Sequence, residues 1–151
     1  MGNLQYFLIA LFVFVLDRLS KFLAGVGYRG GHPIFFRNGF FSLHYVKNSG
    51  GAFGLFPRKG YLFLLITVIA VGLLVYLLFF SGLRQSITKL GLAFLLGGSL
   101  GNLVDRLMTG AVVDFIQVWR APIFNLADVA IVTGAGLVIF MLAGGSRFLG
   151  Q

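Results

Sequence analysis

The hydrophobic residues of this chain gather in four long stretches, and most charged residues lie between or at the ends of these stretches. Residues 61–80 form the clearest stretch, because they contain no charged residue. A helix needs about 20 apolar residues to cross the hydrocarbon core of a bilayer. The pattern predicts an all-α membrane protein with four transmembrane helices, at about residues 4–24, 61–80, 87–104 and 125–143.

The other three stretches contain polar residues at positions that a spanning helix tolerates. The charged residues of the first stretch cluster at its far end, as expected at a membrane boundary. Lys89 can extend its side chain to the interface from the start of the third stretch. The fourth stretch is long enough to cross the bilayer if it begins near Asn125 and Asp128 lies close to the interface.

The first stretch could instead be a cleaved signal peptide. Residues 1–3 provide no basic segment, however, and no A-x-A cleavage site follows. We therefore interpret residues 4–24 as a helix that stays in the membrane.

Residues 25–60 form the longest segment predicted to lie outside the membrane. From Phe40 to Lys47, aromatic, polar and β-branched side chains alternate along an extended chain. The pairs Asn38-Gly39 and Gly50-Gly51 bound this run, and such pairs are typical of turns. The pattern predicts a small β-sheet on the bilayer surface. Because no repeat or linker interrupts the chain, we expect residues 1–151 to form a single integral membrane domain.

Composition agrees with a membrane protein. The chain is 58% hydrophobic and only 11% charged, with a mean hydropathy of +0.96, which is far from the composition of a soluble domain. The net charge is +8, and five of the twelve basic residues lie in residues 25–60. Membrane lipids with anionic headgroups are the expected partners of this loop, and nucleic acid is not. The absence of cysteine excludes disulfides and a thiol nucleophile.

All four acidic residues are aspartates, and each lies in or beside a hydrophobic segment: Asp17, Asp105, Asp114 and Asp128. A carboxylate near hydrocarbon is unfavourable by roughly 3 kcal/mol and therefore suggests a functional site. Taken singly, Asp114 could be a turn or capping residue. Asp128 could simply occupy the first turn of a helix that Asn125 caps.

If Asp114 and Asp128 meet, repulsion between the carboxylates would make them share one proton. The ionised carboxyl group could then remove a proton from a water molecule while the protonated one polarises a peptide carbonyl group. Such a pair would hydrolyse a peptide bond without a covalent intermediate, a metal or another cofactor.

Other catalytic arrangements have less support. His44 and Ser49 could form a triad with an aspartate, but they lie in a loop at unconstrained spacing. An H-E-x-x-H zinc motif is impossible because the chain has no glutamate.

Several further polar residues and glycines have structural interpretations. Asp17 and Lys21 are four residues apart, and an ion pair on one helix face is the simplest explanation. The Asp105-Arg106 pair is also interpreted as structural, although its arginine could contact a substrate backbone or headgroup. Three glycines are expected to allow close helix approach: Gly97, Gly98 and Gly101.

Taken together, five sequence blocks resemble the lipoprotein signal peptidases, also called signal peptidase II. The blocks are Asp17-Arg-Leu-Ser-Lys21, Asn48-Ser-Gly-Gly-Ala-Phe-Gly54, Gly97-Gly-Ser-Leu-Gly-Asn-Leu-Val-Asp-Arg106, Val112-Val-Asp-Phe115 and Phe124-Asn-Leu-Ala-Asp128. They follow the order of the family and span nearly the whole chain.

This resemblance implies an aspartic endopeptidase with Asp114 and Asp128 as catalytic residues. It implies that five residues line or brace the site: Asn48, Gly50, Asn102, Arg106 and Asn125. Asp17 and Lys21 would support the site from the first helix. The implied substrate is a prolipoprotein whose lipobox cysteine carries a diacylglyceryl group, cut on the amino side of that cysteine. The implied inhibitor is the cyclic peptide globomycin.

The resemblance also implies a location in the bacterial cytoplasmic membrane, with both termini in the cytoplasm. The active site and an extracytoplasmic sheet, or cradle, would then lie at the outer face. The distribution of basic residues favours the opposite orientation, because more of them lie in the first and third connections. We follow the resemblance, since the basic loop can instead serve headgroups or substrate.

Two other classes of function remain as alternatives. A proton-coupled transporter would also use intramembrane aspartates, but in the middle of helices that line a path. A non-catalytic assembly protein would need no buried aspartate. Asp114→Asn distinguishes the three functions. It should abolish peptide cleavage in a peptidase, abolish ion flux in a transporter, and affect neither in an assembly protein.

Overall fold

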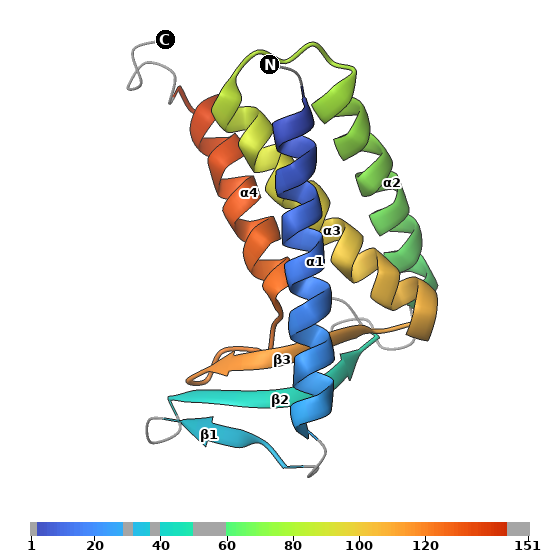
Figure 1. The fold of residues 1–151 in the computed structure, drawn as a ribbon, viewed down its shortest axis with the longest axis vertical. Coiled ribbons are helices and arrows are strands. Elements are labelled where there is room, and N and C mark those ends of the chain that lie inside the picture. Colours follow the sequence, from blue (N-terminus) through green and yellow to red (C-terminus); the bar gives the residue numbers. More distant parts are fainter. Residues whose placement is uncertain (1–2, 29–31, 37–39, 50–59, 145–151) are drawn as a thin grey trace.

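The computed structural model describes residues 3–28, 32–36, 40–49 and 60–144, which form a helical bundle resting on a small β-sheet (Figure 1). The helices are α1 (Leu4–Gly27), α2 (Gly60–Phe79), α3 (Ser86–Thr109) and α4 (Leu126–Leu142), and the strands are β1 (Ile34–Phe36), β2 (Phe41–Asn48) and β3 (Val112–Val118). Each predicted helical stretch is a helix. The start of α1 and the end of α4 lie at the end of the bundle away from the sheet.

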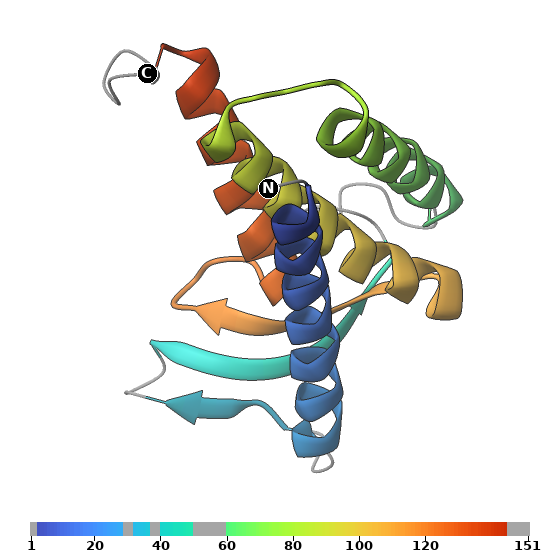
Figure 2. The ribbon, with the colours of Figure 1, turned by 45° about the horizontal axis from the view of Figure 1, so that its top comes forward.

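Helix α3 is the centre of the bundle and packs against α1, α2 and α4. Helices α2 and α4 lie on opposite sides of it, as both views show (Figure 2). Glycines make these contacts close. A Cβ atom at Gly97 would lie 2.5 Å from the Ala10 carbonyl oxygen of α1, and one at Gly98 would lie 2.6 Å from the Ala127 carbonyl oxygen of α4. The predicted role of these glycines in helix approach is confirmed.

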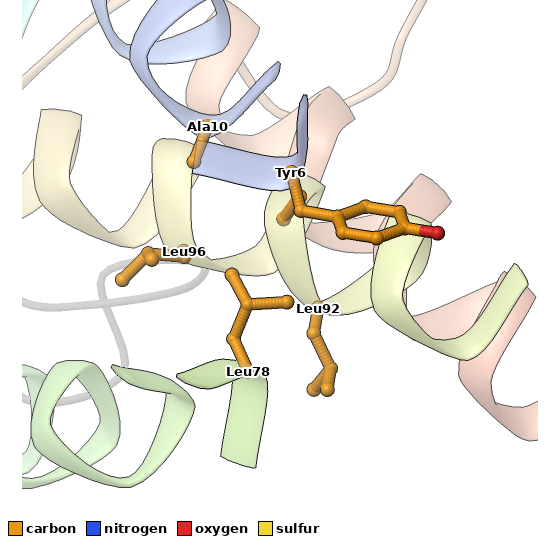
Figure 3. Close-up of a cluster of buried hydrophobic side chains, with 6 residues drawn as sticks. Tyr6, Ala10, Leu78, Leu92 and Leu96 are labelled. Atoms are coloured by element: carbon orange, nitrogen blue, oxygen red, sulfur yellow. The ribbon is translucent and has the colours of Figure 1, made fainter. Parts of the chain in front are cut away.

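A hydrophobic cluster joins α1, α2 and α3 near the end of the bundle away from the sheet. Figure 3 shows side chains from these three helices around Leu92, and the buried members are Tyr6, Ala10, Leu78, Leu92, Ala93 and Leu96. Outside this cluster, most large side chains of α2 are exposed, and Leu78 is the one buried residue of that helix. An apolar helix with an exposed apolar surface is suited to lipid contact.

Two of the described helices, α2 and α3, are long and apolar enough by composition to cross a membrane. Helix α4 is apolar but has only 17 residues. Helix α1 contains the charged cluster that the sequence places at its far end. Membrane crossing by all four helices therefore remains a prediction.

The helix bounds differ from the predicted ones by more than one residue in two places. Helix α3 continues to Thr109 rather than ending at residue 104, so Asp105 and Arg106 lie inside the helix. It ends where Gly110 adopts a left-handed conformation with φ of 74°, and glycine takes this conformation without steric cost. Helix α1 similarly extends to Gly27 instead of residue 24.

The sheet is antiparallel, with strand order β1-β2-β3. The predicted sheet in the first loop is confirmed for β1 and β2, but its third strand, β3, comes from the connection after α3 and was not predicted. Strand β2 pairs with it through Val46 opposite Asp114 and Asn48 opposite Val112. A bulge between Leu43 and Val46 breaks the strict alternation of β2.

Some predicted features lie outside the described residues. They include the turns at Asn38-Gly39 and Gly50-Gly51 and four basic loop residues, Arg29, Arg37, Arg58 and Lys59.

Candidate active site

Asp114 and Asp128 come from different elements and line the same cavity. Asp114 lies in the middle of β3, and Asp128 lies in the first turn of α4. The cavity measures about 400 Å³ and lies where α3, β3 and the start of α4 meet. Asp114 is 4% exposed, whereas Asp128 is only partly buried. Two carboxyl groups that differ in solvent exposure therefore lie beside the same cavity.

Asn125 connects the two carboxyl groups. It is fully buried, and its Oδ1 atom accepts a 2.9 Å hydrogen bond from the backbone N–H of Asp128, as an N-cap residue should. The Asp128 carboxylate completes a capping box by accepting a 3.2 Å bond from the Asn125 backbone N–H. The other side-chain atom, Nδ2, donates a 2.6 Å bond to Asp114 Oδ1. The predicted N-cap of α4 is confirmed, and the same Asn125 side chain also contacts β3.

Two more asparagines each donate to one of the aspartates. Asn48 Nδ2, at the end of β2, donates to Asp114 Oδ2 at 3.0 Å. Asn102 Nδ2, on α3, donates to Asp128 Oδ1 at 3.0 Å. Amide donors from three elements therefore restrict the orientation of both carboxyl groups, and a fixed geometry is what a reacting pair requires.

Burial raises the pKa of Asp114 above its ordinary value, and the nearby Asp128 carboxylate acts in the same direction. The hydrogen bonds from Asn48 and Asn125 oppose this shift because they favour the ionised form. The larger effect is the removal of the carboxylate from water. Asp114 is thus suited to hold a proton that an exposed aspartate would release.

Arg106 brings a cation to the same cavity. Its side chain is among the lining groups, and its Nη1 atom donates a 3.2 Å bond to Thr67 Oγ1 of α2. This contact orients the guanidinium group, and the carboxylates of Asp114 and Asp128 interact with its charge. The position is compatible with the alternative interpretation of Arg106 as a substrate contact.

A buried ion cluster lies behind the cavity. Lys21 is 4% exposed, and its Nζ atom lies 2.8 Å from Asp17 Oδ2 and 2.7 Å from Asp105 Oδ2. The predicted ion pair of Asp17 and Lys21 is therefore present. Asp105 also forms an ion pair with Arg18 and accepts the backbone N–H of Val113.

The cluster also contacts the start of α4. Asp17 Oδ1 accepts a 3.0 Å bond from the backbone N–H of Ala127, one residue before Asp128. The pair of Arg18 and Asp105 was not predicted, because the two residues are 87 positions apart. Helical spacing places Asn102 and Asp105 on one face of α3, but it does not indicate Arg18 of α1 as a partner.

The walls of the cavity are largely apolar. They include Val112 and Ile131 and the segment between β3 and α4, namely Ala121, Pro122, Ile123 and Phe124. A neighbouring cavity of about 310 Å³ shares Phe124, Asp128 and Val132 with it. Their place in the cavity wall could not be predicted, because apolar residues occur throughout the sequence of a membrane protein and carry no distinguishing signal.

The alternative sites do not assemble in the described part of the chain. His44 Nε2 lies 2.9 Å from the hydroxyl oxygen of Ser42, its neighbour on the same face of β2. Its side chain lines a different cavity, of about 290 Å³, together with Phe115. Among the described residues there is also no group of three potential metal ligands. Gly50, expected to line the site, lies outside the residues that the structure describes.

Comparisons with known proteins agree on one family. A family model described as signal peptidase (SPase) II matches residues 9–143. Lipoprotein signal peptidases of Moorella thermoacetica and Pelotomaculum thermopropionicum are 37% identical over 139 residues and 40% identical over 140 residues. These alignments cover 92% and 93% of this chain, and 93% and 92% of the respective relatives.

Two solved structures also have this fold. Both are described as a bacterial membrane enzyme, at 2.3 Å and 1.9 Å resolution, and both are 31% identical to this chain. The first superposes with a TM-score of 0.84 over 92% of this chain and 87% of the other. The second superposes with a TM-score of 0.82 over 93% of each.

Proposed function

The chain belongs to the signal peptidase II family, and from that premise we propose that it removes signal peptides from diacylglyceryl-modified prolipoproteins by aspartic catalysis. Its relatives are lipoprotein signal peptidases, so it is a peptidase of a bacterial membrane that acts on prolipoproteins. The aspartic mechanism depends on one observation above all. The side chain of Asn125 donates to the Asp114 carboxyl group and its backbone N–H donates to the Asp128 carboxyl group, so the two carboxyl groups converge on one cavity.

The proposed reaction is general acid–base hydrolysis. The ionised carboxyl group removes a proton from a water molecule, whose oxygen attacks the carbonyl carbon of the peptide bond. The protonated carboxyl group donates a hydrogen bond to the carbonyl oxygen, where negative charge develops. Collapse of the tetrahedral intermediate breaks the C–N bond, and the proton taken from water passes to the leaving amine. Neither a covalent intermediate nor a metal takes part.

The remaining proposed site residues hold this pair in place. Asn48 and Asn102 each donate to one carboxyl group. Arg106 offsets the negative charge of the pair and faces the cavity in which substrate would bind. Asp17 and Lys21 support the start of α4 from behind. Gly50 keeps its proposed role as a lining residue on the strength of the family resemblance alone.

The apolar walls are suited to a lipidated substrate. A diacylglyceryl group keeps the substrate in the membrane plane, and Phe124, Ile131 and Val132 offer apolar surface beside the aspartates. The scissile bond on the amino side of the modified cysteine could therefore reach the pair without leaving the interface. We propose that globomycin occupies the same cavity and that membrane lipids contact the exposed apolar helix faces.

For orientation, we propose four spanning helices with both termini in the cytoplasm. The start of α1 and the end of α4 lie together, away from the sheet and the aspartates (Figure 1). One membrane crossing per helix would place the site and the sheet at the outer face of the cytoplasmic membrane. A reporter fused to Gln151 should read as cytoplasmic, and an external signal would reverse the proposed orientation.

The test of function is cleavage of a diacylglyceryl-modified lipobox peptide by purified protein in detergent. Wild type should cut before the lipidated cysteine, and Asp114→Asn and Asp128→Asn should remain folded but inactive. His44→Gln is the control, because His44 lies at a different cavity and should be dispensable. Activity retained by either aspartate variant would refute aspartic catalysis, and an inactive wild type would refute the peptidase assignment for this substrate.

A further inference from the structure

Thr67 lies where the start of α2 meets the end of α3, as both views show (Figures 1 and 2). Apart from two tyrosines, it is the only residue of α2 with a polar side chain. Thr67 is partly buried. The apolar residues that precede and follow it are exposed: Leu65, Ile66, Val68 and Ile69. Thr67 is therefore on the side of α2 that packs against α3.

The hydroxyl group of Thr67 accepts a hydrogen bond from Arg106. Arg106 Nη1 lies 3.2 Å from Thr67 Oγ1, and a guanidinium group can only donate. The hydroxyl group has a single proton, which it donates to the carbonyl oxygen of Phe63, four residues earlier in α2, at 2.6 Å. Both the donor and the acceptor capacity of Thr67 are thus used, and its contact with Arg106 has only one possible direction.

Arg106 is held close to the aspartate pair but apart from it. It lines the cavity together with Asp114 and Asp128, and both carboxylates interact with its charge. Among the described residues, carboxylates form ion pairs with Arg18 and Lys21 but not with Arg106. The carboxyl oxygens of the pair accept N–H groups of asparagines instead.

A direct ion pair between Arg106 and either aspartate would oppose the proposed hydrolysis. An arginine side chain is long, and opposite charges attract strongly where water is excluded, so this pairing is the competing arrangement. It would occupy a carboxyl oxygen that has to accept or donate a proton, and it would withdraw the cation from the substrate. The guanidinium group is planar, so fixing one N–H group at Thr67 restricts the direction of the others.

We propose that Thr67 is a positioning residue, which holds the guanidinium group of Arg106 on the α2 side of the cavity, apart from the aspartates and available to the substrate. This inference rests on the proposed function, because it concerns the same cavity and the same reaction. Thr67 acts through Arg106 and contacts no reacting atom. It gives the largely exposed helix α2 a task in catalysis.

The kinetic test uses the diacylglyceryl-modified lipobox peptide. Thr67→Val has nearly the shape of wild type but lacks the acceptor, so kcat/KM should fall about tenfold, less than in Arg106→Gln. Thr67→Ser keeps the hydroxyl group and should retain wild-type kinetics. In the Arg106→Gln background, Thr67→Val should cause no further loss, because a residue that acts only through Arg106 has no guanidinium group left to position.

A spectroscopic measurement reports the same contact without cleavage. Protein labelled with ¹⁵N in its arginine side chains should give an Arg106 signal that Arg106→Gln removes. This signal should shift in Thr67→Val, because Nη1 loses its acceptor, and stay at the wild-type position in Thr67→Ser. If valine disturbs the packing of α2 on α3, Thr67→Ala removes the same acceptor and should give the same shift and the same loss of activity.

The matched control is Thr88→Val, near the start of α3. It removes another threonine hydroxyl bond, 2.9 Å to Gln85 Oε1, and should leave kcat/KM and the Arg106 signal unchanged. Wild-type kinetics in Thr67→Val would overturn the inference, as would an equal loss with and without Arg106 or an unmoved Arg106 signal. Absence of cleavage by wild type would refute the proposed function, while the spectra still decide whether Thr67 holds Arg106.

Discussion

Asn125 Nδ2 lies 2.6 Å from Asp114 Oδ1, although the two residues belong to different elements and are 11 positions apart. The same asparagine caps α4 through Asp128. One side chain therefore sets both the start of a helix and the distance of a strand carboxyl group from it. Stability and geometry of the site depend on this residue in separable ways.

Asn125→Ala should lower both stability and activity. Loss of the cap should reduce the free energy of unfolding by about 1 kcal/mol. Loss of the bond to Asp114 should reduce kcat about a hundred-fold, because the pair is no longer aligned. Asn125→Ser separates the effects, since serine can cap α4 but its hydroxyl group is too short to reach β3. Thermal unfolding should recover in the serine variant while cleavage does not; recovery of both would contradict the bridging role.

The pH dependence of stability should report the burial of Asp114. Its pKa is raised in the folded protein from an ordinary value of 3.8, so the folded state holds this proton more tightly than the unfolded state. The resulting stabilisation is present below the ordinary value and is lost as pH rises through the raised one. Asp114→Asn cannot ionise and should gain stability relative to wild type over that interval. Melting temperatures that stay parallel across the interval would contradict the shift.

Gly101→Ala should disrupt the ion cluster. A Cβ atom at Gly101 would overlap the Asp17 carboxyl group, which is fully buried against it. We expect loss of both melting temperature and peptidase activity, because displaced Asp17 no longer holds the Ala127 N–H. Gly136→Ala is the matched control on α4, where a Cβ atom meets nothing within 4 Å. It should be neutral or stabilise by up to about 1 kcal/mol; equal damage from both changes would show that the contact with Asp17 is unimportant.

Arg106→Gln should impair catalysis with little effect on folding. The guanidinium group lines the cavity and is held by Thr67, so its removal takes a cation away from the developing negative charge. A loss of about a hundred-fold in kcat/KM is typical when one such donor is removed. Arg120→Gln controls for the loss of a positive charge, because Arg120 packs over the ring of Trp119 and is not among the residues that line the cavity. Similar kinetics for both variants would exclude a specific role for Arg106.

The local features of this protein can be predicted from its amino-acid sequence. The apolar stretches predicted the positions of the helices. They did not predict the end of α3 at Thr109, because hydropathy does not indicate where a residue in the left-handed conformation ends a helix. Spacing within a few residues identified the Asn125 cap and the Asp17–Lys21 pair. These features follow from interactions between residues one helical turn apart, which any helical segment of this sequence would form.

Contacts between residues far apart in the chain follow from the packing of the helices and the pairing of the strands. The third strand joins the sheet because β3 pairs with β2, and this pairing places Asn48 beside Asp114. Packing of α3 between α1 and α4 brings Lys21 to Asn102 and Asn102 to Asp128. No local pattern encodes these contacts, because they depend on helix crossing and strand register between residues 26 to 81 positions apart. The sequence supplied the four carboxyl groups, and the packing of the bundle on its sheet selected two of them for one cavity.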